Sequence, residues 1–87
     1  MFNPNQPMVN QYFAMIKNAG YKYSKDELGY YFDNGLKRFS IMRTGPFVQA
    51  FYNKREDGNW KLQDKQTTTI QLYESLQWIL QKIQSGV

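Results

Sequence analysis

Apolar residues recur at helical spacing near the N-terminus of the chain. This repeat predicts a helix over about residues 6–19, beginning at Asn5 or Gln6, with Pro7 in the first turn, where proline loses no hydrogen bond. Gly20 stands where glycine commonly ends a helix. The apolar side of this helix, which we expect to face a core, carries Met8, Val9, Tyr12, Phe13, Ile16 and Ala19.

A second apolar stripe at helical spacing lies near the C-terminus and predicts a helix over about residues 69–84. One of Thr67, Thr68 or Thr69 is expected to cap its first turn, and Gly86 follows its end. Its apolar side carries Ile70, Tyr73, Leu76, Leu80 and Ile83, and this stripe is widened by Leu72, Trp78 and Ile79. Two amphipathic helices need an apolar surface against which to pack.

Between the helices, apolar and polar residues alternate with the two-residue period of strands. The alternation predicts antiparallel strands over about residues 37–43, 47–54 and 60–65. Turn residues separate them, Thr44-Gly45-Pro46 between the first two and Asp57-Gly58 before the third. This part of the chain is therefore expected to form an antiparallel meander.

The segment before these strands admits two interpretations. Ser24-Lys25-Asp26-Glu27 has the form of a helical capping box and predicts a short helix. The run Tyr30-Tyr31-Phe32 instead favours a strand over about residues 29–33, followed by a type I′ turn at Asn34-Gly35. We favour the strand. The chain is thus expected to form one α+β domain over residues 1–87, with a three- or four-stranded antiparallel β-meander between an N-terminal and a C-terminal helix.

This predicted order of elements resembles the topology of the double-stranded RNA-binding domain, which is similar in length and also runs α-β-β-β-α. In such domains the last helix begins with a lysine-rich stretch, and this stretch binds phosphate groups. The equivalent stretch here, residues 66–71, contains glutamine, threonine and isoleucine and no lysine. The resemblance is therefore confined to topology, and no site residue is transferred from that family.

Side-chain alternation divides the first two strands of the meander into two faces. A two-residue loop at Thr44-Gly45 pairs Arg43 with Pro46 and Ile41 with Val48. The apolar face, which should lie under the helices, then carries Phe39, Ile41, Val48, Ala50 and Tyr52. The opposite face mixes aromatic, basic and amide groups and carries Arg38, Ser40, Met42, Phe47, Gln49 and Phe51. This mixed face is either open or covered by a helix of its own.

The length of the Asp57-Gly58 turn decides where the next strand directs its side chains. A two-residue loop places Trp60 and Leu62 on the face of Phe51, whereas a bulged three-residue loop places them with Tyr52. Both arrangements fit the sequence.

Charge gives the mixed face a candidate function. The chain has 11 Lys+Arg against 7 Asp+Glu, a net charge of +4, and no acidic residue lies between positions 34 and 55. Aromatic rings stack on bases, and nearby cations bind phosphates, so an open sheet face of this kind suits single-stranded nucleic acid. The candidate residues are Phe47 and Phe51 for stacking, and Arg38, Arg43, Lys54 and Arg55 for phosphate.

An alternative function is that of a protein-interaction or inhibitor module. It would use Trp60 and exposed tyrosines as anchors, since such residues dominate protein interfaces. The tyrosine cluster comprises Tyr21, Tyr23, Tyr30 and Tyr31. These tyrosines also suit a second layer of core plus scattered surface tyrosines. Nucleic acid and protein are therefore the two expected classes of partner.

The composition argues against catalysis. The chain has no histidine and no cysteine, which removes common metal ligands, nucleophiles and proton shuttles. Its carboxylates show no catalytic spacing, and its glycines form no phosphate-binding loop. We expect a non-enzymatic protein without a metal or cofactor. No segment has the roughly 20 apolar residues of a membrane span, and residues 1–5 show no signal-peptide pattern, so we expect a cytoplasmic protein without a membrane partner.

Overall fold

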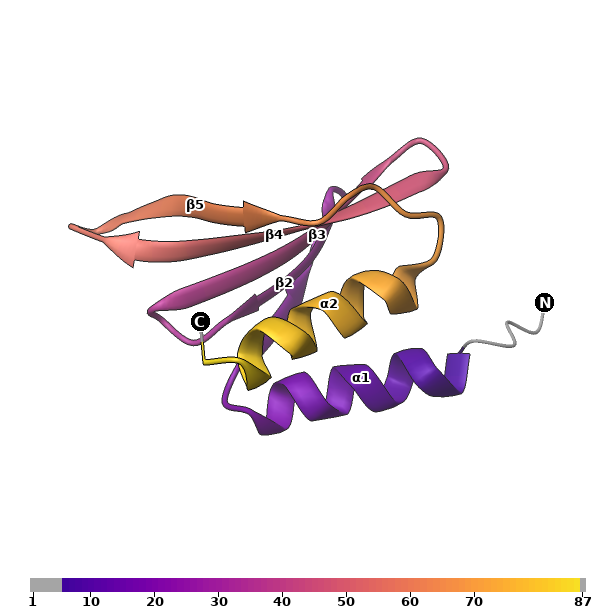
Figure 1. Ribbon diagram of the computed structural model, residues 1–87, viewed down its shortest axis with the longest axis horizontal. Helices are drawn as coiled ribbons and strands as arrows, with labels where there is room; N and C mark the ends of the chain where they lie inside the picture. The colour runs from indigo at the N-terminus through magenta and orange to yellow at the C-terminus, as the bar shows by residue number, and fades with distance from the viewer. Residues whose placement is uncertain (1–5, 87) are drawn as a thin grey trace.

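The computed structural model describes residues 6–86 and shows a helix, a five-stranded antiparallel sheet and a second helix (Figure 1). Strand order in the sheet follows chain order, so the predicted α+β meander is confirmed, although it has five strands rather than three or four. The elements are α1 (Gln6–Asn18), β1 (Lys22–Lys25), β2 (Gly29–Asp33), β3 (Lys37–Thr44), β4 (Phe47–Glu56), β5 (Asn59–Lys65) and α2 (Leu72–Gln84). The expected helix start at Asn5 and the interpretation of residues 1–5 lie outside the described residues.

Strand β1 is the element that the sequence pattern missed. Ser24 and Lys25 belong to this strand, so the capping-box interpretation was wrong, while the favoured strand at 29–33 is confirmed as β2. Asp26 stabilises a turn instead: its Oδ1 accepts hydrogen bonds from the backbone N–H groups of Leu28 and Gly29, at 2.8 and 3.0 Å. With β1 and β2 added, the order of elements also differs from α-β-β-β-α.

The turn after β2 also differs from the prediction. Asn34 lacks the positive φ that a type I′ turn requires, because Asp57 is the only described non-glycine residue with one. The side chain of Asn34 stabilises the turn, since its Oδ1 accepts hydrogen bonds from the N–H groups of Leu36 and Lys37 at 2.9 and 2.7 Å. The hairpin forms at the expected place by a different mechanism.

The hairpin between β3 and β4 has a different register from the predicted one. Thr44 pairs with Phe47, so the loop consists of Gly45 and Pro46 rather than Thr44 and Gly45. Gly45 has a φ of +61°, which suits the first loop position of a type II′ hairpin. Ile41 consequently pairs with Ala50 instead of Val48. Because the error is two residues, every side chain keeps the face that was predicted for it.

Helix α2 begins at Leu72, later than the predicted residue 69, and the expected threonine cap is wrong. Thr69 extends the sheet instead, with N–H groups and carbonyl oxygens exchanged between Thr69 and Val48 at 2.8 and 2.9 Å. Ile70, assigned to the helix's apolar side, lies outside the helix and is exposed. The segment between β5 and α2 is therefore tied to the sheet before the helix starts.

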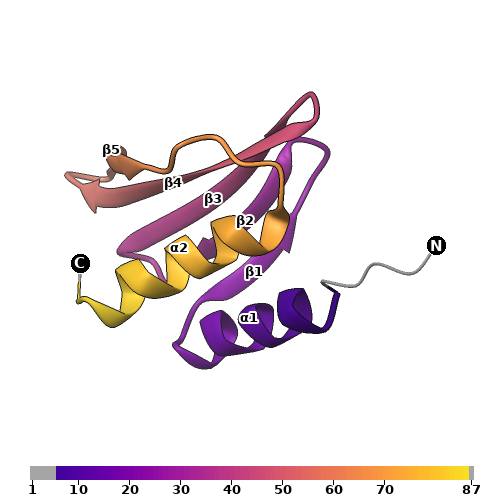
Figure 2. The same ribbon diagram turned by 45° about the vertical axis from the view of Figure 1, so that its right-hand side comes forward.

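Both helices pack against the same face of the sheet (Figures 1 and 2). Phe39 lies at the centre of this core, with its ring stacked on that of Tyr52 at a centroid distance of 4.8 Å. The buried apolar residues are Val9, Ile16, Tyr21, Phe32, Phe39, Ile41, Val48, Ala50, Tyr52, Leu76, Ile79 and Leu80. No described helix lies over the opposite face, so the alternative in which helices cover both faces is wrong.

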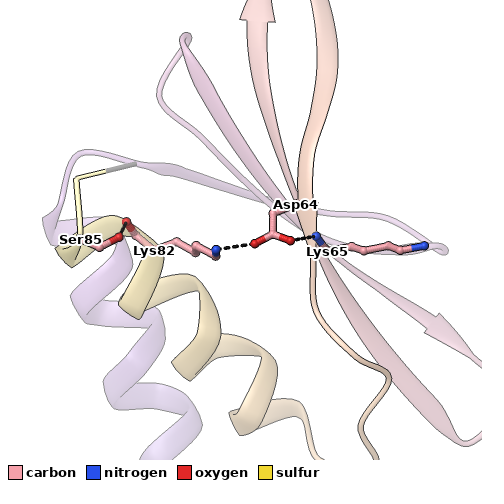
Figure 3. Close-up of polar contacts among 4 residues, drawn as sticks. All are labelled: Asp64, Lys65, Lys82 and Ser85. Atoms are coloured by element: carbon pink, nitrogen blue, oxygen red, sulfur yellow. Dashed lines mark hydrogen bonds and ion pairs between the residues drawn. The ribbon is translucent and has the colours of Figure 1, made fainter.

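Helix α2 is joined to β5 by an ion pair. The Lys82 ammonium donates to Asp64 Oδ2, while Asp64 Oδ1 accepts from the backbone N–H of Lys65 at 2.8 Å (Figure 3). The hydrogen bond from Lys82 and then that from Lys65 hold the pKa of Asp64 below its ordinary value. In the described part of the chain, neither helix is long and apolar enough to cross a membrane.

This ion pair predicts a component of acid instability. A lowered pKa means that Asp64 stabilises the fold above the unfolded-state pKa, about 4, and that this stabilisation disappears as the pH falls through the folded-state pKa. Asp64→Asn should therefore flatten the acid limb of a pH–stability profile measured by urea denaturation. Lys82→Gln should also flatten the acid limb. The double variant should flatten it little more than either single variant does. An acid limb unchanged in Asp64→Asn would contradict the assignment.

Candidate functional site

We call the sheet surface opposite the helices the open face. Strand alternation and the pairing register define it, because paired residues on neighbouring strands direct their side chains to the same side. Its aromatic residues are Tyr31, Phe47, Phe51 and Trp60, and its basic residues are Lys22, Arg38, Arg55 and Lys65. Figure 3 shows Lys65 directed away from Asp64 and α2. The open face therefore combines rings with cations.

The turn before β5 places Trp60 on the open face. Asp57 and Gly58 have φ values of +52° and +80°, as a two-residue type I′ loop requires. Glu56 then pairs with Asn59, and Arg55 with Trp60. The register shift on β5 comes later, between the pairs of Tyr52 and Asn53. Of the two arrangements that the sequence allowed, the two-residue loop is the one adopted.

Arg38 lies at the centre of this surface, between two rings. Its guanidinium carbon is 5.3 Å from the ring centroid of Tyr31 and 5.6 Å from that of Trp60. On the other side of the array, the guanidinium carbon of Arg55 is 5.8 Å from the Trp60 centroid. Such contacts orient a guanidinium group without cancelling its charge. The rings and arginines thus form one continuous array across β2, β3, β4 and β5.

The charges of this array are not neutralised by nearby carboxylates. The ion pairs found among the described residues are Lys61–Glu56 and Lys82–Asp64, and neither involves Arg38 or Arg55. The Nε atom of Arg38 is buried and has no hydrogen-bond partner. Because this Nε is shielded, Arg38 can meet an anion only through the terminal nitrogens of its guanidinium group. The open face therefore presents guanidinium groups without a carboxylate partner.

A hydrogen bond fixes the ring of Tyr31 at the edge of the array. Its hydroxyl donates to Asp26 Oδ1 at 3.1 Å. Burial, followed by this bond to the carboxylate, raises the pKa of Tyr31. Burial by itself would raise the pKa of Asp26, but hydrogen bonds from Leu28, Gly29 and Tyr31 bring it below its ordinary value. Tyr31 therefore stays protonated, and its ring supports the Arg38 guanidinium.

Phe47 and Phe51 are the rings that remain available on the open face. Phe47 is 44% exposed and Phe51 is half-buried. Neither takes part in the ring–ring or cation–ring contacts found among the described residues, unlike Tyr31 and Trp60. The two are four residues apart on β4, or about 13 Å at roughly 3.3 Å per residue. They form two separate apolar platforms beside the arginines.

The structure gathers some of the predicted site residues and separates others. Arg38, Phe47, Phe51 and Arg55 share the open face. Arg43 pairs with Val48 of the core, and Lys54 pairs with Lys37 and Lys61, so both lie on the helix-facing side of the sheet. Tyr31 and Trp60 were predicted as anchors for a protein partner and not as part of the nucleic-acid site, although their rings contact the guanidinium groups.

Most of the tyrosine cluster belongs to the core side. Tyr21 is buried, and Tyr23 and Tyr30 lie with Phe13 of α1 at centroid distances of 5.1 and 5.8 Å. Of the four clustered tyrosines, Tyr31 faces the other way. The structure thus favours the interpretation of this cluster as a second layer of core plus surface tyrosines, since Tyr23 is 38% exposed.

Comparison with known proteins found no matching family model, no matching curated protein and no matching solved structure. Within residues 6–86, no group of three or more acidic, histidine or cysteine side chains is placed to hold a metal ion. The open face is therefore the feature of this protein that indicates a function.

Proposed function

We propose that this protein binds single-stranded nucleic acid through the open face. The observation that carries the proposal is the array of unneutralised arginines between aromatic rings on a sheet surface without a covering helix. Proteins that bind single strands with little sequence preference combine aromatic stacking platforms with cations that meet the phosphates. The open face offers both within one surface.

The geometry gives the residues distinct roles in this proposal. Phe47 and Phe51 stack on bases, since their rings have no competing ring or cation contact. Arg38 and Arg55 bind phosphate oxygens, because a guanidinium presents planar donors that match them. Trp60 positions both guanidinium groups. Each stacked base should contribute about 1–3 kcal/mol.

A protein partner is the second candidate, and exposed apolar side chains favour it. Phe47 is 44% and Leu62 56% exposed on the same face. An interface built on these residues would depend on apolar burial and respond little to salt. Phosphate binding instead weakens steeply as ionic strength rises. The protein's cations displace counterions from the nucleic acid, and this release is less favourable when the salt concentration is high. Salt dependence therefore separates the two candidates.

Tryptophan fluorescence provides a direct test of the proposed site. The protein has 2 tryptophans, and Trp60 lies on the open face while Trp78 lies in α2. Trp78→Phe leaves Trp60 as the reporter, and we expect its emission to change when oligothymidylate is added at low salt. More oligonucleotide should be needed for the same change as salt is raised. The salt slope, which is the fall of the logarithm of the binding constant per unit of log salt concentration, should be about 0.7 per phosphate bound.

The matched control is Trp60→Phe, which leaves Trp78 as the reporter. Trp78 packs at the edge of the core, so its emission should not respond to the oligonucleotide. A response of Trp78 alone would place binding on the helix side. If neither tryptophan responds and fluorescence anisotropy of a labelled strand stays flat at low salt, the nucleic-acid proposal is wrong and the protein-partner candidate takes its place.

A further inference from the structure

A hollow of about 430 Å³ lies on the open face beside Arg38, at the β1 edge of the sheet. Its walls come from the loop after α1, strand β1, the β2–β3 turn and the start of β3. The polar side chains that line it include Lys22, Ser24, Asp33 and Arg38. Volumes of this order accommodate small ligands. The hollow therefore continues the arginine–aromatic array as a recess with its own polar groups.

Lys22, Asp33 and Arg38 form one row across β1, β2 and β3, because Lys22 pairs with Asp33 and Asp33 pairs with Arg38. The outer two are cations, about 10 Å apart at roughly 4.8 Å per strand. Asp33 is directed into the adjacent turn, where its Oδ1 accepts a hydrogen bond from the N–H of Gly35. Neither cation forms an ion pair with it. The recess thus keeps an excess of positive charge.

We propose that this hollow binds a phosphate group of the bound single strand. The inference rests on the proposed function and assigns the phosphate subsite within it. Guanidinium, ammonium and hydroxyl groups, here of Arg38, Lys22 and Ser24, are the side-chain groups that proteins use for phosphate oxygens. Arg38 lines the recess, and no ion pair with a carboxylate neutralises its guanidinium group. Because Arg38 also contacts Tyr31 and Trp60, a phosphate held there lies next to the aromatic array.

The phosphate has two sources that share this chemistry: the end of a strand or an internucleotide linkage. Strands with and without terminal phosphates distinguish them. We use oligothymidylate of about ten nucleotides, within the usual site size of a single-strand binding module, carrying a 5′-phosphate, a 3′-phosphate or neither. An end subsite predicts tighter binding of one phosphorylated strand. An internucleotide subsite predicts equal affinities for all three.

Lys22→Gln tests the subsite, and Lys25→Gln is its matched control. Both lysines belong to β1, but Lys25 lies over the ring of Tyr30 on the helix side. For an internucleotide phosphate, Lys22→Gln should weaken binding roughly two- to fivefold, as for an exposed ion pair. The salt slope should fall by about 0.7. For a terminal phosphate, Lys22→Gln should abolish the preference for the phosphorylated strand. Lys25→Gln should change neither property.

Asp33→Asn should have the opposite effect from Lys22→Gln and strengthen binding of the strand. The amide oxygen can still accept from the N–H of Gly35, so the turn is kept, while the only carboxylate among the described residues that line the hollow is removed. Affinity should rise roughly two- to fivefold, by the same measure of one exposed charge.

The subsite is refuted if oligothymidylate binds wild-type protein but Lys22→Gln and Lys25→Gln bind it equally, with no effect of terminal phosphates. The proposed function then still stands. If the wild-type protein binds none of the strands, both proposals fail.

Discussion

Phe39→Ala is expected to lower the free energy of unfolding by about 3–5 kcal/mol, the usual effect of deleting a fully buried aromatic ring. Phe39 has no exposed surface, and its ring contacts those of Tyr52 and Tyr21 at centroid distances of 4.8 and 5.7 Å. Removing it leaves a cavity beneath both helices, which the neighbouring rings can fill only in part. Urea denaturation followed by circular dichroism measures the loss.

The control for this prediction lies on the opposite face of the same sheet. Phe47→Ala removes an identical side chain that is 44% exposed, and should cost less than about 1 kcal/mol. The difference between the two losses in free energy of unfolding measures how unequally the two faces of the sheet are packed. Equal losses would mean that the open face is packed against something, either a second copy of the chain or another part of it, and would contradict the proposed site.

The division of the sheet into two faces was predictable because it depends only on local alternation. Phe39, Ile41, Val48 and Ala50 were assigned to the buried face correctly, although the pairing between their strands was wrong by two residues. Pairing register depends on which residues occupy the turn, and both Thr44-Gly45 and Gly45-Pro46 are plausible turns. Period-two alternation is insensitive to an even shift, so the error left the faces intact.

Strand β1 could not be recognised from the alternation of apolar and polar residues. It has 4 residues, all of them exposed, and forms the edge of the sheet. Its stability comes from pairing with β2 and from the contact of Tyr23 with Phe13 of α1, a partner ten residues away in the sequence. A short polar strand shows no alternation, while the sequence around Asp26 offers a strong local pattern for a cap. Contacts with residues five to eleven positions away, which neither local pattern includes, decided between strand and cap.

The candidate site was predictable in part. Phe47, Phe51 and Arg38 follow from alternation, and the same rule excludes Arg43, because an odd separation from Arg38 places it on the other face. Charge density along the chain had favoured including Arg43, and the face assignment is the stronger argument. Trp60 required the φ angles of the turn before β5, for which the sequence allowed two solutions.

Arg38→Ala is expected to have the largest effect on nucleic-acid binding. Its guanidinium contacts Tyr31 and Trp60 and reaches the hollow at the β1 edge, so the variant loses a phosphate contact and frees both rings. A hydrogen bond to a charged group contributes about 1.5–3 kcal/mol, so affinity for oligothymidylate should fall roughly 10- to 100-fold. The salt slope should decrease by about 0.7. Fluorescence anisotropy across a salt series measures both quantities.

Two further variants separate the contribution of charge from that of geometry. Arg38→Lys keeps the charge but loses the planar group that stacks between rings, so it should preserve the salt slope while weakening binding. Arg43→Ala removes an equal charge from the helix-facing side of the same strand and should alter neither property. If Arg43→Ala weakens binding as much as Arg38→Ala, the interaction follows net charge rather than the open face, and the arrangement of rings and arginines described above is not the binding site.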